Sequence, residues 1–292
     1  MLDKRYQTLI VLVENKSFTK TAKRLFITQP AVSQQIASLE SELNFPIVIR
    51  THHQIEITSA GLELAKFAKK ITFESQKLIA SLQQASHSFK MGCTLSLSAT
   101  LLPQFLHHLS SKTSVVATRI NNTEHILQDI RNGKVDFGLV EGNFNKDEFD
   151  SFFLQQENFI CVSHQEIPAD TIEGLFTTPL LIREKGSGSR QILENWLGTQ
   201  NLHLSDFEKT LEIASPSTII ELLKSNIGIS FMYESLVKID LKAGRLKKLS
   251  LPGFNIEHPI NLVFVKNSYF KDTYKRIINS FLEQTDQTTN QN

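Results

Sequence analysis

Residues 17–40 read SFTKTAKRLFITQPAVSQQIASLE, and their pattern of apolar and polar residues predicts two short helices joined by a tight turn. Ser17 and Thr28 stand where helix N-caps are expected, because a hydroxyl there accepts a hydrogen bond from a free backbone N–H. Pro30 falls in the first turn of the second helix, where proline costs no hydrogen bond. Each helix has one apolar stripe that is expected to be buried, formed by Ala22, Leu25 and Phe26 in the first and by Val32, Ile36 and Leu39 in the second. The stretch therefore predicts a helix-turn-helix.

The outer face of the second helix is polar, short-chained and free of acidic residues near its start. Gln pairs with the N7 and N6 edge of adenine, and Ser bonds to several bases. A helix-turn-helix places these N-terminal residues in the major groove. Contacts to double-stranded DNA are therefore expected from Thr28, Gln29, Pro30, Ala31, Ser33 and Gln34. The spacing alone also fits any two-helix corner with a solvated face, so that alternative stays open.

The run from Ser17 to Glu40, with TQPAVS at residues 28–33, resembles the DNA-binding signature of LysR-type transcriptional regulators, and the match continues through Arg50 and TSAG at 58–61. Thr21 stands where the family usually has alanine, and NFPIVI at 44–49 replaces the usual Gly followed by Leu-Phe; we interpret both as repacking. The resemblance implies a mixed α/β protein that regulates transcription. Its expected parts are an N-terminal winged helix-turn-helix, a long linker helix, and a C-terminal two-lobed α/β effector domain similar to periplasmic binding proteins.

Residues 48–50 and 55–58 predict two short strands joined by THHQ at 51–54, which together would form a β-hairpin wing. The resemblance implies that such a wing lies along the DNA backbone, so DNA contacts are expected from Arg50, His52 and His53. Arg50 carries a permanent charge. Histidine has an ordinary pKa of about 6.5, which predicts that DNA binding strengthens as the pH falls from 8 to 6. A solvated loop whose histidines have no role is the alternative.

A helix is predicted from about residue 60 to residue 86, capped by Thr58 or Ser59, with a hinge at 86–92. Its apolar residues recur at a spacing near 3.5, which is typical of a coiled coil. We expect dimerisation through Leu64, Ala68, Ile71, Leu78 and Leu82. Packing of this helix against the body of its own chain remains the alternative, whereas the resemblance implies a dimerising linker helix.

From residue 93 onward, strand-like and helix-like segments alternate, which predicts an α/β fold with parallel strands. Strands are expected at 94–99, 115–120, 135–140, 159–163, 180–183, 228–232 and 262–266. Helices are expected at 101–109, 123–132, 191–197, 217–225, 233–238 and 271–283, followed by a frayed end at 284–292. The expected domains are the winged helix-turn-helix at 1–59, the linker at 60–91 and the effector domain at 92–292. Within the last, lobe I would hold 92–163 and 263–284 and lobe II 164–262, with crossings near Ser163 and Leu262.

The segment REKGSGSR at residues 183–190 is the most informative one in the body. Gly186 and Gly188 allow the backbone to approach a ligand closely, and the helix N-terminus that follows favours an anion. Arg183 and Arg190 suit a carboxylate or phosphate, whereas Glu141 suits an amino group or caps the turn at Asn143. Effector contacts are expected from Thr100, Glu141, Arg183, Ser187, Gly188, Ser189 and Ser215. A glycine-serine turn with an ordinary cap is the alternative, and the resemblance favours a small anionic metabolite in an inter-lobe cleft.

The net charge of +1 hides an asymmetry along the 292 residues. Residues 1–90 carry 12 Lys or Arg and 7 Asp or Glu, whereas residues 91–292 carry 19 and 23. A basic head on a mildly acidic body favours nucleic acid as the partner of the head. No signal peptide and no apolar run long enough for a bilayer is evident, so a cytoplasmic location and no membrane partner are expected.

No enzyme signature is present in the chain. The segment at 186–189 lacks the G-x-S-x-G spacing, and neither a phosphate loop nor H-E-x-x-H occurs. Cys93 and Cys161 have no metal or redox spacing, so neither a metal site nor a cofactor is expected. A solute-binding protein without a DNA role is the rival class, although it would not need the first 90 residues. The expected partners are an inverted-repeat duplex, a small metabolite effector, RNA polymerase, and further copies of this chain as a homodimer or homotetramer.

Overall fold

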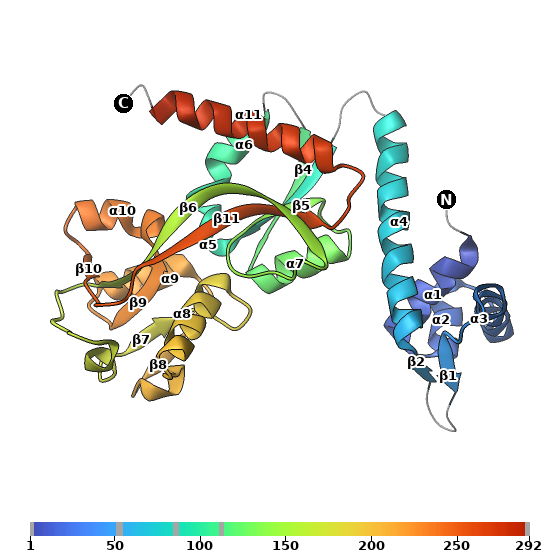
Figure 1. Ribbon diagram of the computed structural model, residues 1–292, viewed down its shortest axis with the longest axis horizontal. Helices are drawn as coiled ribbons and strands as arrows, with labels where there is room; N and C mark the ends of the chain where they lie inside the picture. The colour runs from blue at the N-terminus through green and yellow to red at the C-terminus, as the bar shows by residue number, and fades with distance from the viewer. Residues whose placement is uncertain (1–2, 51–54, 84–87, 111–113, 290–292) are drawn as a thin grey trace. The chain divides into compact units, whose positions relative to one another are not determined.

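The computed structural model describes residues 3–50, 55–83, 88–110 and 114–289 and divides into two compact units, residues 1–85 and 86–292 (Figure 1). The first unit is the helical head with the long helix α4 (Ser59–Gln83), and the second is the α/β body. None of the helices in the described ranges combines the length and apolar character that a membrane crossing requires.

Three helices and a two-stranded hairpin make up the head. The helices are α1 (Lys4–Asn15), α2 (Phe18–Leu25) and α3 (Gln29–Leu43), and β1 (Val48–Arg50) pairs antiparallel with β2 (Ile55–Ile57). Their fully buried core consists of Leu9, Leu12, Ile36, Leu39 and Ile47. The helix-turn-helix and the strands of the wing are thus present as predicted.

Both predicted N-caps of the helix-turn-helix are confirmed. The Ser17 hydroxyl accepts the Lys20 N–H at 3.3 Å, and the Thr28 hydroxyl accepts the Ala31 N–H at 3.3 Å. The prediction of a buried Phe26 is wrong, because its side chain is 95% exposed. Helix α2 ends at Leu25, and Phe26 adopts a left-handed backbone with φ of 56°, so the helical spacing no longer applies to it.

The two departures from the family signature are local repacking. Thr21 is fully buried, and its hydroxyl donates to the Ser17 carbonyl at 2.8 Å, which satisfies the polar atom that alanine would lack. Asn44 ends α3 with φ of 58°, a left-handed conformation that asparagine tolerates where glycine is usual.

Helix α4 (Ser59–Gln83) begins at a tight junction with the head. The Thr58 hydroxyl accepts the Gly61 N–H at 3.0 Å, so Thr58 is the cap. A Cβ atom on Gly61 would lie 2.6 Å from the carbonyl oxygen of Ile47, so only glycine fits this close approach. The structure describes the helix as far as Gln83, and the predicted end at residue 86 lies outside the described residues.

The body contains one nine-stranded mixed sheet in the order β4-β3-β5-β11-β6-β9-β7-β8, with β10 paired to β6. Its strands are β3 (Ser88–Thr94), β4 (Ser114–Asn121), β5 (Phe137–Val140), β6 (Phe149–Ser163), β7 (Leu180–Ile182), β8 (Thr210–Glu212), β9 (Ile229–Tyr233), β10 (Lys247–Leu249) and β11 (Ile256–Val265). Its α-helices are α5 (Leu95–Ser98), α6 (Leu102–Ser110), α7 (Thr123–Arg131), α8 (Gly188–Thr199), α9 (Pro216–Lys224), α10 (Glu234–Lys242) and α11 (Lys271–Thr289).

Two long strands join the two lobes of the body. Strand β6 pairs antiparallel with β11 from Phe149↔Val265 to Phe159↔Ile256, and both run through the middle of the sheet (Figure 1). Strand β5 of lobe I pairs with β11 at 261–263, and β9 of lobe II pairs with β6 at 159–163. The crossings therefore lie at about 155–158 and 257–260, a few residues before the predicted positions at Ser163 and Leu262.

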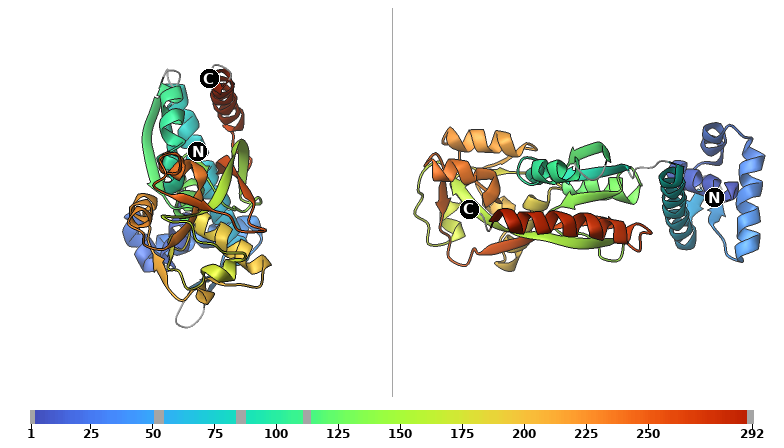
Figure 2. Two further views of the ribbon diagram at one scale, coloured as in Figure 1. Left: turned by 90° about the vertical axis from the view of Figure 1, so that its left-hand side faces the viewer. Right: turned by 90° about the horizontal axis from the view of Figure 1, so that it is seen from above.

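Helices cover both faces of the sheet in lobe I. Figure 1 shows α6 and α11 on one side and α7 on the other, and Figure 2 shows α11 lying along β6. On the α6 and α11 side, rings from strands and helices pack edge to face: Phe89, Phe105, Phe137, Tyr274 and Phe281. On the other side, a Cβ atom on Gly138 would lie 2.7 Å from the Ile126 side chain, so glycine lets α7 pack close to the sheet.

Lobe II is built around strands β7 and β9 and the end of β6. Its core joins these strands to α9 and α10 through Ile160, Val162, Leu181, Ile219, Leu223, Met232, Val237 and Leu246. On the α8 side, Phe254 packs against Trp196 and Phe231 at ring-centroid distances of 4.7 and 5.1 Å.

Several predicted elements of the body are wrong in extent or type. The strand predicted at 94–99 is β3 at 88–94 followed by the turn of helix α5, so most of the predicted hinge is strand. The alternation LSLS at 95–98 fits either structure when it is so short. Helix α8 begins at 188 rather than 191, and α11 continues to Thr289 where a frayed end was expected.

Candidate functional site

The N-terminal turn of α3 presents the side chains predicted to read DNA. Gln29, Pro30 and Gln34 are exposed, and Ala31 and Ser33 are partly exposed. The inner side of the same helix is formed by Val32, Ile36 and Leu39, all buried. The structure therefore brings the predicted polar residues together on the outer surface.

Helix α2 adds positive charge beside this surface. Lys20 and Lys23 are exposed, and the Arg24 guanidinium lies 2.8 Å from the Glu14 carboxylate. The first turn of α3 contains no acidic residue. Lysines in this position suit phosphate contacts, which fix the register of a protein on a duplex. The pattern KTAKR at 20–24 carries this signal in the sequence, beside the polar face of the second helix.

The wing is described only in part. Arg50 lies opposite Ile55 in the β1–β2 pairing. The side chain of Arg50 is outside the described part of the structure, as are residues 51–54 with His52 and His53. Their DNA contacts and the pH dependence remain predictions.

The apolar stripe predicted for dimerisation is divided along the length of α4. Leu64 packs against the core of the head, and Ala68 is 1% exposed, so these two residues stabilise the head instead of facing a partner. Ile71 and Leu78 are partly exposed, whereas Leu82 is 78% exposed. Phe67 and Ile79 are also exposed apolar residues that the heptad reading missed.

In the body, the carboxyl ends of parallel strands from both lobes meet, as expected for α/β sheets. Thr94 ends β3 and Glu141 follows β5, whereas Arg183 follows β7 and Tyr233 ends β9. Strands β3 and β5 are parallel to each other, and so are β7 and β9. The Arg183 Nη1 donates to the Ser96 hydroxyl at 3.4 Å across the two lobes.

Backbone contacts close one edge between the lobes. The Glu124 N–H donates to the Gly186 carbonyl at 3.0 Å. The Gly188 N–H donates to the Thr123 hydroxyl at 3.1 Å, which itself donates to the Glu141 carbonyl at 3.1 Å. A Cβ atom on Gly188 would lie 2.6 Å from that carbonyl oxygen, so the glycine permits the contact.

Glu141 is the buried acid of this region, with only 1% of its surface exposed. The Thr94 hydroxyl donates to its carboxylate. Burial raises the pKa of Glu141, while the bonds from Thr94 and Ser96 and the charge of Arg183 act in the opposite direction. The environment therefore lacks enough positive charge to offset the desolvation of the carboxylate.

The two arginines predicted to hold an anion already contact carboxylates. Arg183 donates from Nε and Nη2 to Glu184 at 2.8 and 3.0 Å. Arg190 donates to Glu194 at 2.8 Å and to Glu212 at 2.5 Å. Only the Nη1 group of Arg183 points to the other lobe, so the anion site is smaller than predicted.

The serines at the start of α8 are buried, and their hydroxyls lie 3.0 Å apart. Ser187 is the N-cap residue but makes no side-chain cap bond, so Ser187 and Ser189 face each other at the helix N-terminus. Ser215 caps α9 by accepting the Thr218 N–H at 3.2 Å, just after β8, which is parallel to β7. It therefore lies at the same edge of the sheet as Arg183.

Thr100 lies in the turn before α6, and none of the contacts among the described residues joins it to Glu141, Arg183 or 187–189. Thr94 and Ser96 occupy that place instead. Thr94 and Ser96 were not predicted as site residues, because 94–99 was expected to be a strand. Thr94 lies at the end of a buried strand, a position that could have indicated a site residue.

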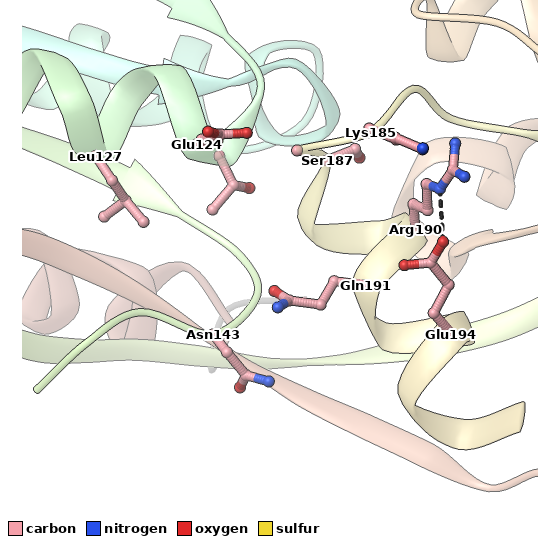
Figure 3. Close-up of a pocket in the computed structure, with 10 residues that line it drawn as sticks. Glu124, Leu127, Asn143, Lys185, Ser187, Arg190, Gln191 and Glu194 are labelled. Carbon is pink, nitrogen blue, oxygen red and sulfur yellow. Dashed lines mark hydrogen bonds and ion pairs between the residues drawn. The ribbon is translucent and has the colours of Figure 1, made fainter. Parts of the chain in front are cut away.

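A groove of about 370 Å³ lies between α7 and the start of α8 (Figure 3). Figure 3 shows Glu124 and Leu127 on one side and Ser187, Arg190 and Gln191 on the other, with Lys185 above and Asn143 below. Lys185 is exposed here, next to the lobe contacts made by Gly186.

Comparison with known proteins matches both units. Residues 4–62 match the family described as bacterial regulatory helix-turn-helix protein, lysR family, and residues 82–286 match the LysR substrate binding domain. The transcriptional regulator CysL of Bacillus subtilis is 26% identical over 94% of this chain and 95% of its own length. The transcriptional activator CmpR of Synechocystis is 26% identical over 90% of this chain and 89% of its own length.

Solved structures of full-length regulators share the fold. ArgP from Mycobacterium tuberculosis aligns with a TM-score of 0.68 at 18% identity, covering 97% of both chains. LysG from Corynebacterium glutamicum, solved with bound effector Arg, aligns with a TM-score of 0.66 at 18% identity over 97% of this chain and 99% of its own. A solute-binding protein without a DNA role is not favoured, because the head matches a DNA-binding family. The chain belongs to the LysR family of transcriptional regulators, with a helix-turn-helix for DNA and a substrate-binding domain for an effector.

Proposed function

We propose that the outer residues of α3 give this regulator its sequence specificity. Thr28, Gln29 and Ser33 would contact base edges, assisted by Pro30, Ala31 and Gln34, while Arg50, His52, His53 and the lysines of α2 would contact phosphate. The observation that carries this proposal is the polar, acid-free N-terminal turn of α3 on the surface of the head. Each well-placed contact of this kind favours the correct base over a wrong one by about 1–3 kcal/mol.

The chain is proposed to act as a homodimer or homotetramer on an inverted repeat. The exposed apolar end of α4, above all Leu82 with Ile71 and Leu78, supports a helix pair between two copies. An inverted repeat follows from the two-fold symmetry of a dimer. Contact with RNA polymerase at a promoter belongs to the same proposal.

The effector is proposed to bind between the lobes of the body, where Glu141, Arg183, Ser187, Gly188 and Ser189 come together. Such a ligand would favour one arrangement of the lobes and so shift the population of the DNA-bound assembly. The proposal needs no metal and no cofactor.

Selection of duplexes from a random pool by the full-length protein tests this function. The expected product is an inverted repeat bound by an even number of chains, and deletion of residues 1–65 should abolish selection. Enrichment without any sequence preference would contradict the proposal.

A further inference from the structure

Four buried polar side chains lie at the strand ends where the two lobes meet. Thr94 is fully buried, Glu141 and Tyr233 are each 1% exposed, and Arg183 is 5% exposed. They come from β3, β5, β7 and β9, two strands from each lobe. The region is therefore built by both halves of the body.

The Glu141 carboxylate is the first group in this region that needs a partner. Among the described residues no Lys, Arg or His forms an ion pair with it: its hydrogen bonds come from the neutral hydroxyls of Thr94 and Ser96, and the charge of Arg183 acts on it without an ion pair. The nearby Arg183 directs two of its nitrogens to Glu184. Buried charges in proteins are normally paired, because taking an ion out of water without compensation is costly.

The Tyr233 hydroxyl is the second such group. It is buried and has no hydrogen-bond partner among the described residues. Burial raises the pKa of Tyr233, and the charges of Glu141 and Glu157 raise it further. A buried tyrosine hydroxyl usually has a partner, and this one is available to accept a hydrogen bond from a ligand.

The chemistry of the missing group follows from these two neighbours. An ammonium group has three N–H donors and a positive charge, so it can donate to the Glu141 carboxylate and to the oxygen of Tyr233 together. A purely anionic ligand would leave Glu141 unpaired and would place a second negative charge beside it.

The opposite side of the region suits a carboxylate. The Nη1 group of Arg183 lies 3.4 Å from Ser96 and is the part of the guanidinium not directed to Glu184. The N-terminus of α8 adds the hydroxyls of Ser187 and Ser189, both buried. Helix N-termini stabilise anions through their free N–H groups.

We propose that the inter-lobe site binds an amino acid, with its ammonium against Glu141 and Tyr233 and its carboxylate against Arg183 and the start of α8. This inference rests on the proposed role of the cleft as effector site and names the ligand class. It extends the expectation of an anionic metabolite to a zwitterion.

The test is binding of the twenty standard amino acids to the full-length protein by thermal shift, followed by titration calorimetry of those that stabilise it. For each such ligand, the matched 2-hydroxy acid, which has a hydroxyl in place of the amine, is measured in parallel. A panel of simple dicarboxylates is included. At least one amino acid should raise Tm, and its 2-hydroxy acid should bind at least tenfold more weakly.

Two variants and a control locate the amine. Glu141→Gln should weaken amino acid binding at least tenfold. Tyr233→Phe should weaken it threefold to tenfold yet leave the Tm of the free protein unchanged or higher, because the lost hydroxyl has no partner there. Glu148→Gln, in an ion pair with Arg131, should bind as the parent does.

Three outcomes would overturn the inference: no amino acid stabilises the protein, the hydroxy acid binds as tightly as the amino acid, or Glu141→Gln and Tyr233→Phe bind unchanged. Stabilisation by dicarboxylates alone would refute the amine while leaving an effector cleft in place. Duplex binding by the same samples reports separately on the regulator function.

Discussion

At the scale of single residues, buried polar groups distinguish structural positions from functional ones. Thr21 is fully buried, but its hydroxyl donates to the Ser17 carbonyl, a bond worth about 1 kcal/mol. Glu141 is equally buried but has no cation paired with it among the described residues. The first arrangement stabilises the fold, whereas the second is a cost that binding can recover.

Replacing Glu141 by Gln should therefore stabilise the ligand-free protein. Burial raises the pKa of Glu141 above its ordinary value of 4.5, so between that value and the raised one the folded state binds more protons than the unfolded state. The parent consequently loses stability as the pH rises through this window. Removing an unpaired buried charge should add about 1–3 kcal/mol at pH 8.

Thermal unfolding of parent and Glu141→Gln from pH 8 down to pH 4.5 measures this. The Tm difference should be largest at pH 8 and shrink towards pH 4.5, where the parent carboxyl is protonated in the folded state. A variant less stable than the parent at pH 8 would contradict this assignment.

Residues of the site could be predicted from the sequence only where neighbouring residues form a recognisable pattern. The glycines and serines at 186–189 indicated a ligand-facing turn, and the structure places them at the lobe contact. Thr94 and Ser96 were missed because a four-residue alternation cannot distinguish a strand from a helical turn. The missing partner of Tyr233 was not predictable, since it depends on which groups surround the hydroxyl in three dimensions.

At the scale of elements, the two ends of α4 differ in what they contact. Its N-terminal half packs into the head through Leu64, Ala65 and Ala68, and its C-terminal end leaves Ile79 and Leu82 exposed. The heptad spacing identified an apolar stripe on this helix but missed the exposed Phe67 and Ile79. It could not show where the head ends, because that depends on how α1 crosses α4.

The exposed end of α4 should determine assembly. Leu82→Glu places a charge in the proposed helix pair and is expected to weaken the dimer at least tenfold, a change of about 1.4 kcal/mol or more. Leu62→Glu is the matched control, because Leu62 is also exposed but lies about half a turn round the same helix. Light scattering over a concentration series measures dimerisation of both variants. An unchanged dimer in Leu82→Glu would contradict the proposed dimer interface.

The long crossing strands show why the extent of the body strands was underestimated. Strand β6 begins at Phe149 and β11 at Ile256, yet both carry polar runs, and β11 contains Pro259. Between the lobes, fewer helices and strands pack against β6 and β11. Their residues there need not be apolar. The mostly buried segments, 159–163 and 260–264, are mainly apolar and were recognised in large part.

At the scale of the whole molecule, regulation depends on the contact between the lobes of the body. Gly188→Ala should prevent this contact, because the new Cβ would lie 2.6 Å from the Glu141 carbonyl and 2.8 Å from the Thr123 hydroxyl. Peptides covering 122–124 and 186–188 should then exchange amide hydrogens at least tenfold faster, while duplex binding persists.

Gly198→Ala is the control for that experiment, since nothing lies within 4 Å of its added Cβ and alanine favours helix α8 by about 1 kcal/mol. Its exchange near 186–188 should match that of the parent. Equal exchange in Gly188→Ala and the parent would show that the lobes do not depend on this contact.

In the proposed function, sequence specificity depends most on contacts between the outer residues of α3 and base edges. Selection from random duplexes with Gln29→Ala/Ser33→Ala, beside Ser41→Ala farther along the same helix, tests this directly. The double variant should lose the preferred sequence or change it while keeping salt-dependent binding, and Ser41→Ala should select as the parent does. An unchanged preferred sequence in the double variant would contradict the account.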